Sequence, residues 1–165
     1  MSQHSLSEAL VDVFNRVFQA AEATILCGGA AEPYYEPGAP SVIYFREDFY
    51  RSALHEVAHW CVAGPVRRGL ADYGYWYVPD GRNAEQQSAF CSVEVKPQAI
   101  EALFCEALDL TFAVSVDNLT VDANCPEITH FKAAVDRQIM RFRQQGLPDR
   151  ALRFKKALAL LAVER

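Results

Sequence analysis

The residues of this sequence with the clearest chemical potential are two histidines in the stretch His55-Glu56-Val57-Ala58-His59. Four residues along an α-helix rise about 6 Å and turn through about 400°, so both imidazoles project from one face. This spacing allows both rings to bind one divalent ion. Glu56 lies about 100° around the helix from His55. There it would flank the ion, where it can accept a proton from a bound water or orient a ligand.

A catalytic metal site needs a third protein ligand and at least one open position. The useful candidates are carboxylates on the next long predicted helix, Glu85, Glu94 and Glu101. Glu94 interrupts an apolar stretch, and a buried carboxylate is costly unless it is paired or bound to metal. Glu85 and Glu101 have ordinary solvated settings in the sequence. We therefore predict His55, His59 and Glu94 as the metal ligands.

Two imidazoles and one carboxylate suit zinc-dependent hydrolysis, and they also suit non-haem iron(II) acting with oxygen. Spacing alone does not choose between the two metals. Taken by itself, an HExxH motif followed by a helical glutamate is first of all typical of a zinc metallopeptidase, with Glu56 as general base. A third interpretation is a non-enzymatic, metal-stabilised interaction module, in which the histidines only hold a helix in place.

The elements that must position these residues follow from hydrophobic spacing along the chain. Helices are predicted over about 6–21, 47–62, 84–108, 126–145 and 149–163, with Pro97 predicting a kink or a break in the third. Short strands or extended segments are predicted at 41–45, 73–77 and 112–116, and an ordered loop at 28–40. We expect the few strands to be antiparallel. The predicted fold is α+β, a single helix-rich metal-binding domain over residues 1–165, with its metal site on the HExxH helix and a downstream helix.

The composition excludes several classes of protein. The chain has 165 residues, of which 51% are hydrophobic and 22% charged, as in one globular domain with its own core. A net charge of −5 argues against direct nucleic-acid binding as the main role. The 5 cysteines form no CxxC pair and are expected to be reduced. With neither a membrane-spanning apolar run nor a signal-peptide core, we expect a cytoplasmic protein.

A longer ordered set of residues surrounds the motif. It comprises His59-Trp60-Cys61, Gly74-Tyr75-Trp76-Tyr77, Pro79-Asp80-Gly81-Arg82, Val93-Glu94-Val95-Lys96-Pro97 and Leu103-Phe104-Cys105. With His55-Glu56, this set resembles the elongation factor P hydroxylase family, and the resemblance covers most of the chain from about residue 41 onward. Such a set is far more specific than HExxH by itself.

The resemblance implies a protein hydroxylase that acts on a lysine of the translation elongation factor P, after that lysine has received a β-lysyl group. It implies a two-histidine, one-carboxylate metal site and, carried over by residue, the ligands His55, His59 and Glu94. The implied metal is iron, with molecular oxygen as co-substrate, in place of the zinc that spacing alone favours. The source of electrons, 2-oxoglutarate or another reductant, stays open.

A long cationic side chain as substrate calls for aromatic faces and carboxylates in the pocket. We expect substrate-binding residues in the aromatic segment after the motif: Tyr73, Tyr75, Trp76, Tyr77, Asp80 and Arg82. The alternative is that this segment is an aromatic core strand. Glu56, the expected catalytic residue, would orient a metal-bound water or pair with the incoming ammonium, or else hold a histidine in place.

Overall fold

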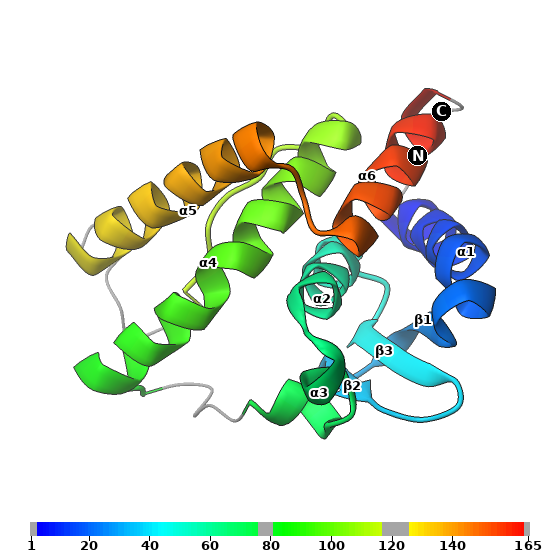
Figure 1. Ribbon diagram of the computed structural model, residues 1–165, viewed down its shortest axis with the longest axis horizontal. Helices are drawn as coiled ribbons and strands as arrows, with labels where there is room; N and C mark the ends of the chain where they lie inside the picture. The colour runs from blue at the N-terminus through cyan, green and yellow to red at the C-terminus, as the bar shows by residue number, and fades with distance from the viewer. Residues whose placement is uncertain (1–2, 76–80, 117–125, 164–165) are drawn as a thin grey trace.

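The computed structural model of the chain describes residues 3–75, 81–116 and 126–163. The elements, in chain order, are α1 Gln3–Glu22, β1 Thr24–Ala30, β2 Tyr34–Glu36, β3 Ser41–Arg46, α2 Tyr50–Val62, α3 Pro65–Arg68, the 3-10 helix η1 Ala71–Gly74, α4 Ala84–Ala107, α5 Pro126–Gln145 and α6 Asp149–Val163. In Figure 1, α2 occupies the centre, α4 and α5 run side by side on one flank, and α1 and α6 lie on the other. The α+β class is as predicted.

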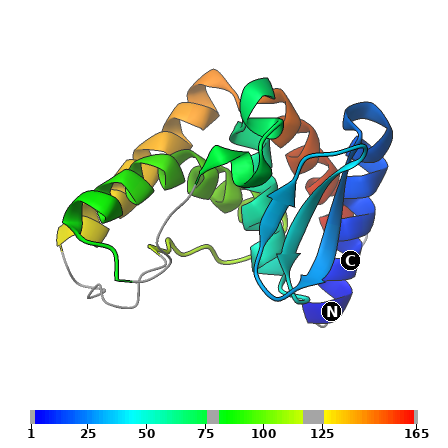
Figure 2. The ribbon, with the colours of Figure 1, turned by 90° about the horizontal axis from the view of Figure 1, so that it is seen from below.

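The sheet is small and mixed, in the order β1-β3-β2. β3 pairs parallel with β1, placing Leu26 opposite Ile43, and antiparallel with β2, placing Tyr35 opposite the same Ile43. Alternate side chains are buried, as the two-residue period of a strand requires: Leu26, Tyr35, Ile43 and Phe45. This buried face meets α1 and α2, and Figure 2 shows the strands in front of these helices.

The main core lies where α1, α2, α4 and α6 meet. Its centre is an aromatic cluster, in which the Trp60 ring lies 5.2 Å from Phe14 and 4.9 Å from Phe18, centroid to centroid. Phe154 of α6 contacts Phe104 of α4 at 5.1 Å in the same edge-to-face manner. Because Trp60 stands next to His59 on α2, this cluster anchors the helix that carries the histidines.

Several predicted elements are confirmed and others are wrong. The helices predicted to begin near residues 47, 84, 126 and 149 are present as α2, α4, α5 and α6. α4 continues through Pro97 and does not break into two helices. The segment 28–40 is not a loop, since β1 ends and β2 lies within it. Strand pairing is not only antiparallel. Residues 112–116 have no regular structure, and Tyr73 and Gly74 belong to η1 rather than to a strand.

The cysteines within the described residues form no disulfide bond. Cys27, Cys61, Cys91 and Cys105 are free thiols, and Cys125 lies outside the described residues. Among the described helices, none combines the length and the apolar character that a bilayer crossing requires.

One side chain joins α1 to the edge of the sheet. The backbone N–H of Leu26 donates to the Asn15 Oδ1 at 2.8 Å, and the Asn15 Nδ2 donates to the Leu26 carbonyl at 3.4 Å. β1 is an edge strand of the sheet, so within the described residues these groups have no strand partner on that side. The amide of Asn15 thus takes the place of a neighbouring strand.

We expect Asn15→Ala to lower the free energy of unfolding by about 1–3 kcal/mol, because it leaves both backbone groups of Leu26 without a partner. Chemical denaturation monitored by Trp fluorescence would measure the change. Gln19→Ala, an exposed amide on the same helix, is the matched control and should be close to neutral. Equal stability of the two variants would contradict the bridging role of Asn15.

Candidate metal centre

α2 presents its histidines from the boundary of the core. Six residues of this helix are buried and fix its orientation: Ala53, Leu54, Val57, Ala58, Trp60 and Cys61. His55 and His59 fall on the remaining face and are half-buried, with their ring centroids 4.7 Å apart. The predicted one-turn spacing therefore does bring the two imidazoles to one place.

α4 lies across this face of α2 and supplies the third group. Glu94 is only 4% exposed, and its Oε1 lies 2.8 Å from the Nε2 of His59. Its Oε2 lies 3.5 Å from the Nε2 of His55, and the two Nε2 atoms are 3.1 Å apart. Nitrogen and oxygen ligands held about 2.1 Å from one ion, at angles of about 90–110°, are themselves about 3.0–3.4 Å apart. The three side chains thus fit three neighbouring positions around a single ion, and they could hold one.

The charges at this cluster stabilise one another. Burial by itself would lower the pKa of His55, but the Glu94 carboxylate and a hydrogen bond to Glu101 outweigh it and raise that pKa to about 10. Burial would likewise raise the pKa of Glu94, but His59 and His55 outweigh it and lower that pKa to about 2. Glu94 is therefore an anion throughout the physiological range, as a metal ligand must be.

Two further residues of α4 hold the cluster in place. The Nδ1–H of His55 donates to the Glu101 Oε2 at 2.8 Å, and the Nε2 of His55 faces Glu94. A metal ion that displaces the Nε2 proton would therefore bind at Nε2 while Nδ1 keeps its hydrogen bond to Glu101. Gln98 donates from its Nε2 to the Glu94 Oε2 at 3.0 Å. Gln98 is also anchored, since its Oε1 accepts from the backbone N–H of Ser115 at 3.0 Å.

The expectation that Glu101 is solvated is wrong, because this side chain is only 9% exposed and bonds to a histidine. A signal was present in the sequence. Glu94, Gln98 and Glu101 are spaced by four and then three residues, so they share one face of a helix. Once Glu94 is assigned as a metal ligand, Gln98 and Glu101 on the same helix face become candidates to hydrogen-bond the ligands and fix their orientation.

Glu56 stands on α2 between the two histidines and is partly buried. Burial raises the pKa of its carboxyl, while the neighbouring His55 and His59 act to lower it. The prediction that Glu56 flanks the histidines is consistent with this electrostatic coupling.

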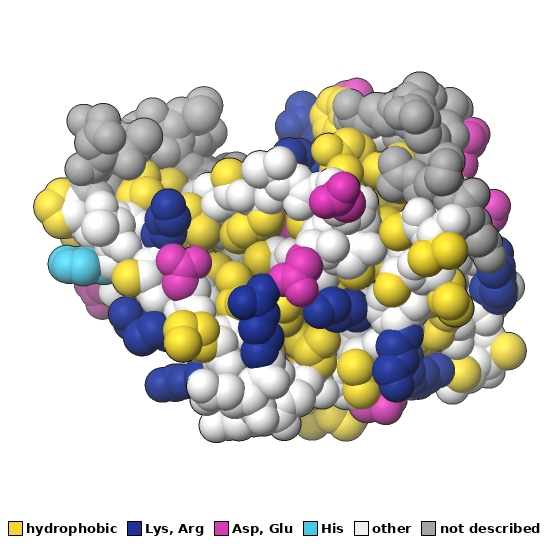
Figure 3. Space-filling view, turned by 90° about the horizontal axis from the view of Figure 1, so that it is seen from above, with side chains coloured by type: hydrophobic (Ala, Val, Ile, Leu, Met, Phe, Trp, Pro, Cys, Tyr) yellow, Lys and Arg dark blue, Asp and Glu magenta, His cyan; other side chains and the backbone are white. Residues whose placement is uncertain are grey.

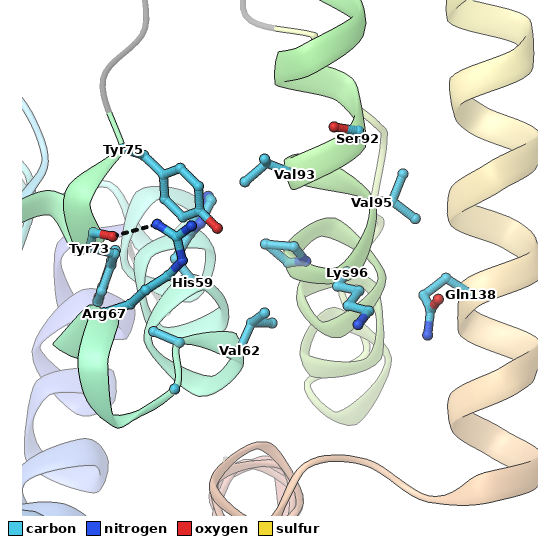
Figure 4. Close-up of a pocket in the computed structure, with 13 residues that line it drawn as sticks. His59, Val62, Arg67, Tyr73, Tyr75, Ser92, Val93, Val95, Lys96 and Gln138 are labelled. Atoms are coloured by element: carbon cyan, nitrogen blue, oxygen red, sulfur yellow. Dashed lines mark hydrogen bonds between the residues drawn. The ribbon is translucent and has the colours of Figure 1, made fainter.

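A pocket of about 530 Å³ opens beside His59, between α2, α3 and η1 on one side and α4 and α5 on the other (Figure 4). Tyr73 and Tyr75, two of the residues predicted to bind substrate, both line it. Asp72 and Tyr73 have φ of 46° and 59°, a left-handed conformation that is costly for such residues. A hydrogen bond offsets part of the cost of this conformation: the backbone N–H of Tyr35 donates to the Asp72 Oδ1 at 2.8 Å.

Arg82, another predicted substrate residue, lies away from this pocket. Arg82 is 7% exposed, and it donates to the Gln87 Oε1 at 3.0 Å and to the Val116 carbonyl at 2.8 Å. Its guanidinium also lies 4.0 Å from the Phe90 ring centroid, and Arg82 is not among the residues that line the pocket. Trp76, Tyr77 and Asp80 lie outside the described residues.

Comparison with known proteins gives one consistent result. The family model described as elongation factor P hydroxylase matches residues 13–162. A curated relative from Haemophilus influenzae, named elongation factor P lysine hydroxylase, is 45% identical over 160 residues, which cover 94% of this chain and 88% of the relative. The matched region contains α2 and α4 and therefore all three converging side chains. The chain belongs to the elongation factor P hydroxylase family.

Proposed function

We propose that this protein is a metal-dependent lysine hydroxylase that adds oxygen to the β-lysylated lysine of elongation factor P in the cytoplasm. The observation that carries the proposal is the convergence of His55, His59 and Glu94, next to a pocket that His59 lines, in a chain that belongs to this family. One domain would serve both for metal binding and for recognition of the protein substrate.

The donor set supports a resident metal ion held by His55 Nε2, His59 Nε2 and Glu94. Two imidazoles and a carboxylate on one face leave further positions open, as in non-haem iron(II) oxygenases. We therefore propose iron(II), with molecular oxygen as co-substrate. Iron in such a site supplies the oxygen-activating chemistry that insertion into an unactivated C–H bond needs. The zinc peptidase alternative shares the same ligands, so the substrate and product distinguish the two.

The residues around the ion have separate tasks in this proposal. Glu101 fixes the ring of His55, and Gln98 fixes the carboxylate of Glu94, so that the donor atoms converge before the ion arrives. Glu56, whose pKa is raised by burial, is coupled electrostatically to His55 and His59, and in this proposal it pairs with the incoming ammonium or orients a bound water. We propose Glu56 as the catalytic residue on this basis.

The pocket walls would hold the alkyl part of the substrate side chain. Tyr73 and Tyr75 form one wall, and Val93 of α4 points toward them from the other (Figure 4). Val95 and Pro97 of α4 also line the pocket. These surfaces exclude water and orient the methylene to be oxidised near the donor atoms. Trp76, Tyr77 and Asp80 remain proposed substrate residues, and Arg82 would contribute indirectly, by holding the start of α4 against Val116.

Purified protein should add one oxygen to β-lysylated elongation factor P when it is supplied with iron(II), air and a reductant. Intact-protein mass spectrometry should show a gain of about 16 Da, the mass of the single oxygen atom that iron oxygenase chemistry inserts. Glu94→Ala should abolish the gain, because it removes an anionic ligand. Glu85→Ala, which removes an exposed carboxylate of the same helix, should retain it. Peptide cleavage, or an equal gain with Glu94→Ala, would refute the proposal.

Glu101→Ala should weaken binding of the metal itself by about 10- to 100-fold, because His55 loses the partner that fixes its orientation. Glu101→Gln should lose less, since its amide oxygen can still accept the Nδ1–H. Cobalt(II) is a suitable probe, since titration gives both a dissociation constant and a visible spectrum that reports ligand geometry. Affinities equal to that of the wild type in both variants would show that Glu101 does not position His55.

A further inference from the structure

The pocket beside His59 carries positive charge and has no negative charge among its described lining residues. Its charged lining side chains are Arg67 of α3 and Lys96 of α4, on opposite walls in Figure 4. Both residues are exposed. This charge is opposite to the one expected for a pocket that takes only a lysine-like side chain. Two cations at the pocket would favour an additional, anionic group.

Arg67 is held in place and retains donors for a ligand. Its Nη1 donates to the Tyr73 carbonyl at 2.9 Å, and its guanidinium lies 3.9 Å from the Tyr75 ring centroid. A guanidinium has five N–H groups, so donors remain after this bond. Neither Arg67 nor Lys96 has a carboxylate partner within the described part of the chain. Such a pair of cations attracts a carboxylate.

Apolar surface continues from the pocket across α3. Val62, Val66 and Leu70 are 36%, 81% and 46% exposed, which is high for their type. The side chains of Leu70 and Arg67 both lie next to Gly74. A Cβ atom built on Gly74 would be 2.8 Å from the Leu70 Cδ1 and 3.8 Å from the Arg67 Nη1, so these two side chains are close to each other. We call these three apolar residues, with Arg67 and Lys96, the docking rim.

The occupant of the docking rim follows from its size and charge. A free carboxylate could meet Arg67 and Lys96, but it would leave Val66 and Leu70 uncovered. A protein segment with acidic and apolar side chains covers both parts. The attraction must be local, since the chain as a whole is at −5 and the face seen in Figure 3 mixes dark blue and magenta side chains.

We propose that the docking rim binds an acidic, apolar segment of the protein substrate next to the target lysine. Carboxylates of this segment pair with Arg67 and Lys96, and its apolar side chains cover Val66 and Leu70. The lysine then extends past the two cations toward His59 and the buried carboxylates. The identity of the substrate rests on the proposed function, whereas the chemistry of the rim does not.

Binding of two short fluorescent peptides to the full-length protein tests the rim without turnover. In one peptide a central lysine is flanked by Asp, Glu and Leu; in the other, Lys and Arg replace the acidic residues. Fluorescence anisotropy should show that the wild type binds the acidic peptide, and that Lys96→Glu weakens this binding by about tenfold or more. Val66→Asp should weaken it as well. Lys156→Glu, the same charge reversal at an exposed position of α6, is the control and should bind normally.

Three results would overturn the proposal. The first is equal binding of the two peptides, and the second is an equal effect of Lys96→Glu and Lys156→Glu on binding. The third is displacement of the acidic peptide by succinate but not by sodium chloride of the same ionic strength. The last result would assign the cations to binding of a free carboxylate.

With elongation factor P as substrate, Lys96→Glu should raise KM by about tenfold and leave kcat nearly unchanged. The KM of this variant should also depend less on salt concentration than that of the wild type. If the peptides behave as expected and elongation factor P is not hydroxylated, the proposed function fails and the docking rim stands.

Discussion

Placement of a buried carboxylate against two imidazoles is the constraint on which this structure depends. Glu94 is nearly inaccessible to solvent, and an isolated charge there would be strongly destabilising. His55 and His59 compensate for it closely enough that its pKa falls to about 2. The packing of α2 against α4 is thus fixed at one point by charge. A metal ion that replaces the proton between these groups would use the same geometry.

The remainder of the fold keeps these two helices in register. Trp60 locks α2 into the aromatic cluster with Phe14 and Phe18 of α1, and α6 closes the cluster through Phe154. On α4, Gln98 ties the helix to the irregular segment at Ser115. The sheet contributes little area, but its buried face supports α1 and α2 from below (Figure 2). Rigid supports on both helices allow donor atoms to converge without a bound ion.

Prediction from the sequence succeeds best where a residue has few stable environments, as a buried carboxylate or a pair of closely spaced histidines does. The HExxH spacing and the apolar surroundings of Glu94 correctly predicted a cluster of three side chains. Glu101 was misjudged because its partner, His55, lies on another helix and only tertiary packing brings the two together. β1 is not predicted because it contains Gly28 and Gly29 near its end, and glycines usually indicate a loop. The segment 112–116 alternates like a strand, but Gln98 binds its backbone in place of a neighbouring strand.

Acidic side chains lie deeper than basic side chains around the histidines and the neighbouring pocket. Glu94 and Glu101 lie inside, around the histidines, and Glu56 is partly buried beside them, whereas Arg67 and Lys96 lie at the exposed pocket. If the proposed substrate enters at this pocket, its cationic side chain would be repelled by Arg67 and Lys96 and attracted only near the buried carboxylates, so a free lysine derivative would gain little from approaching. A chain that presents acidic groups beside a lysine is attracted at both depths, in one orientation. Under the proposed function, selection of a lysine in its protein context would follow from this order of charges.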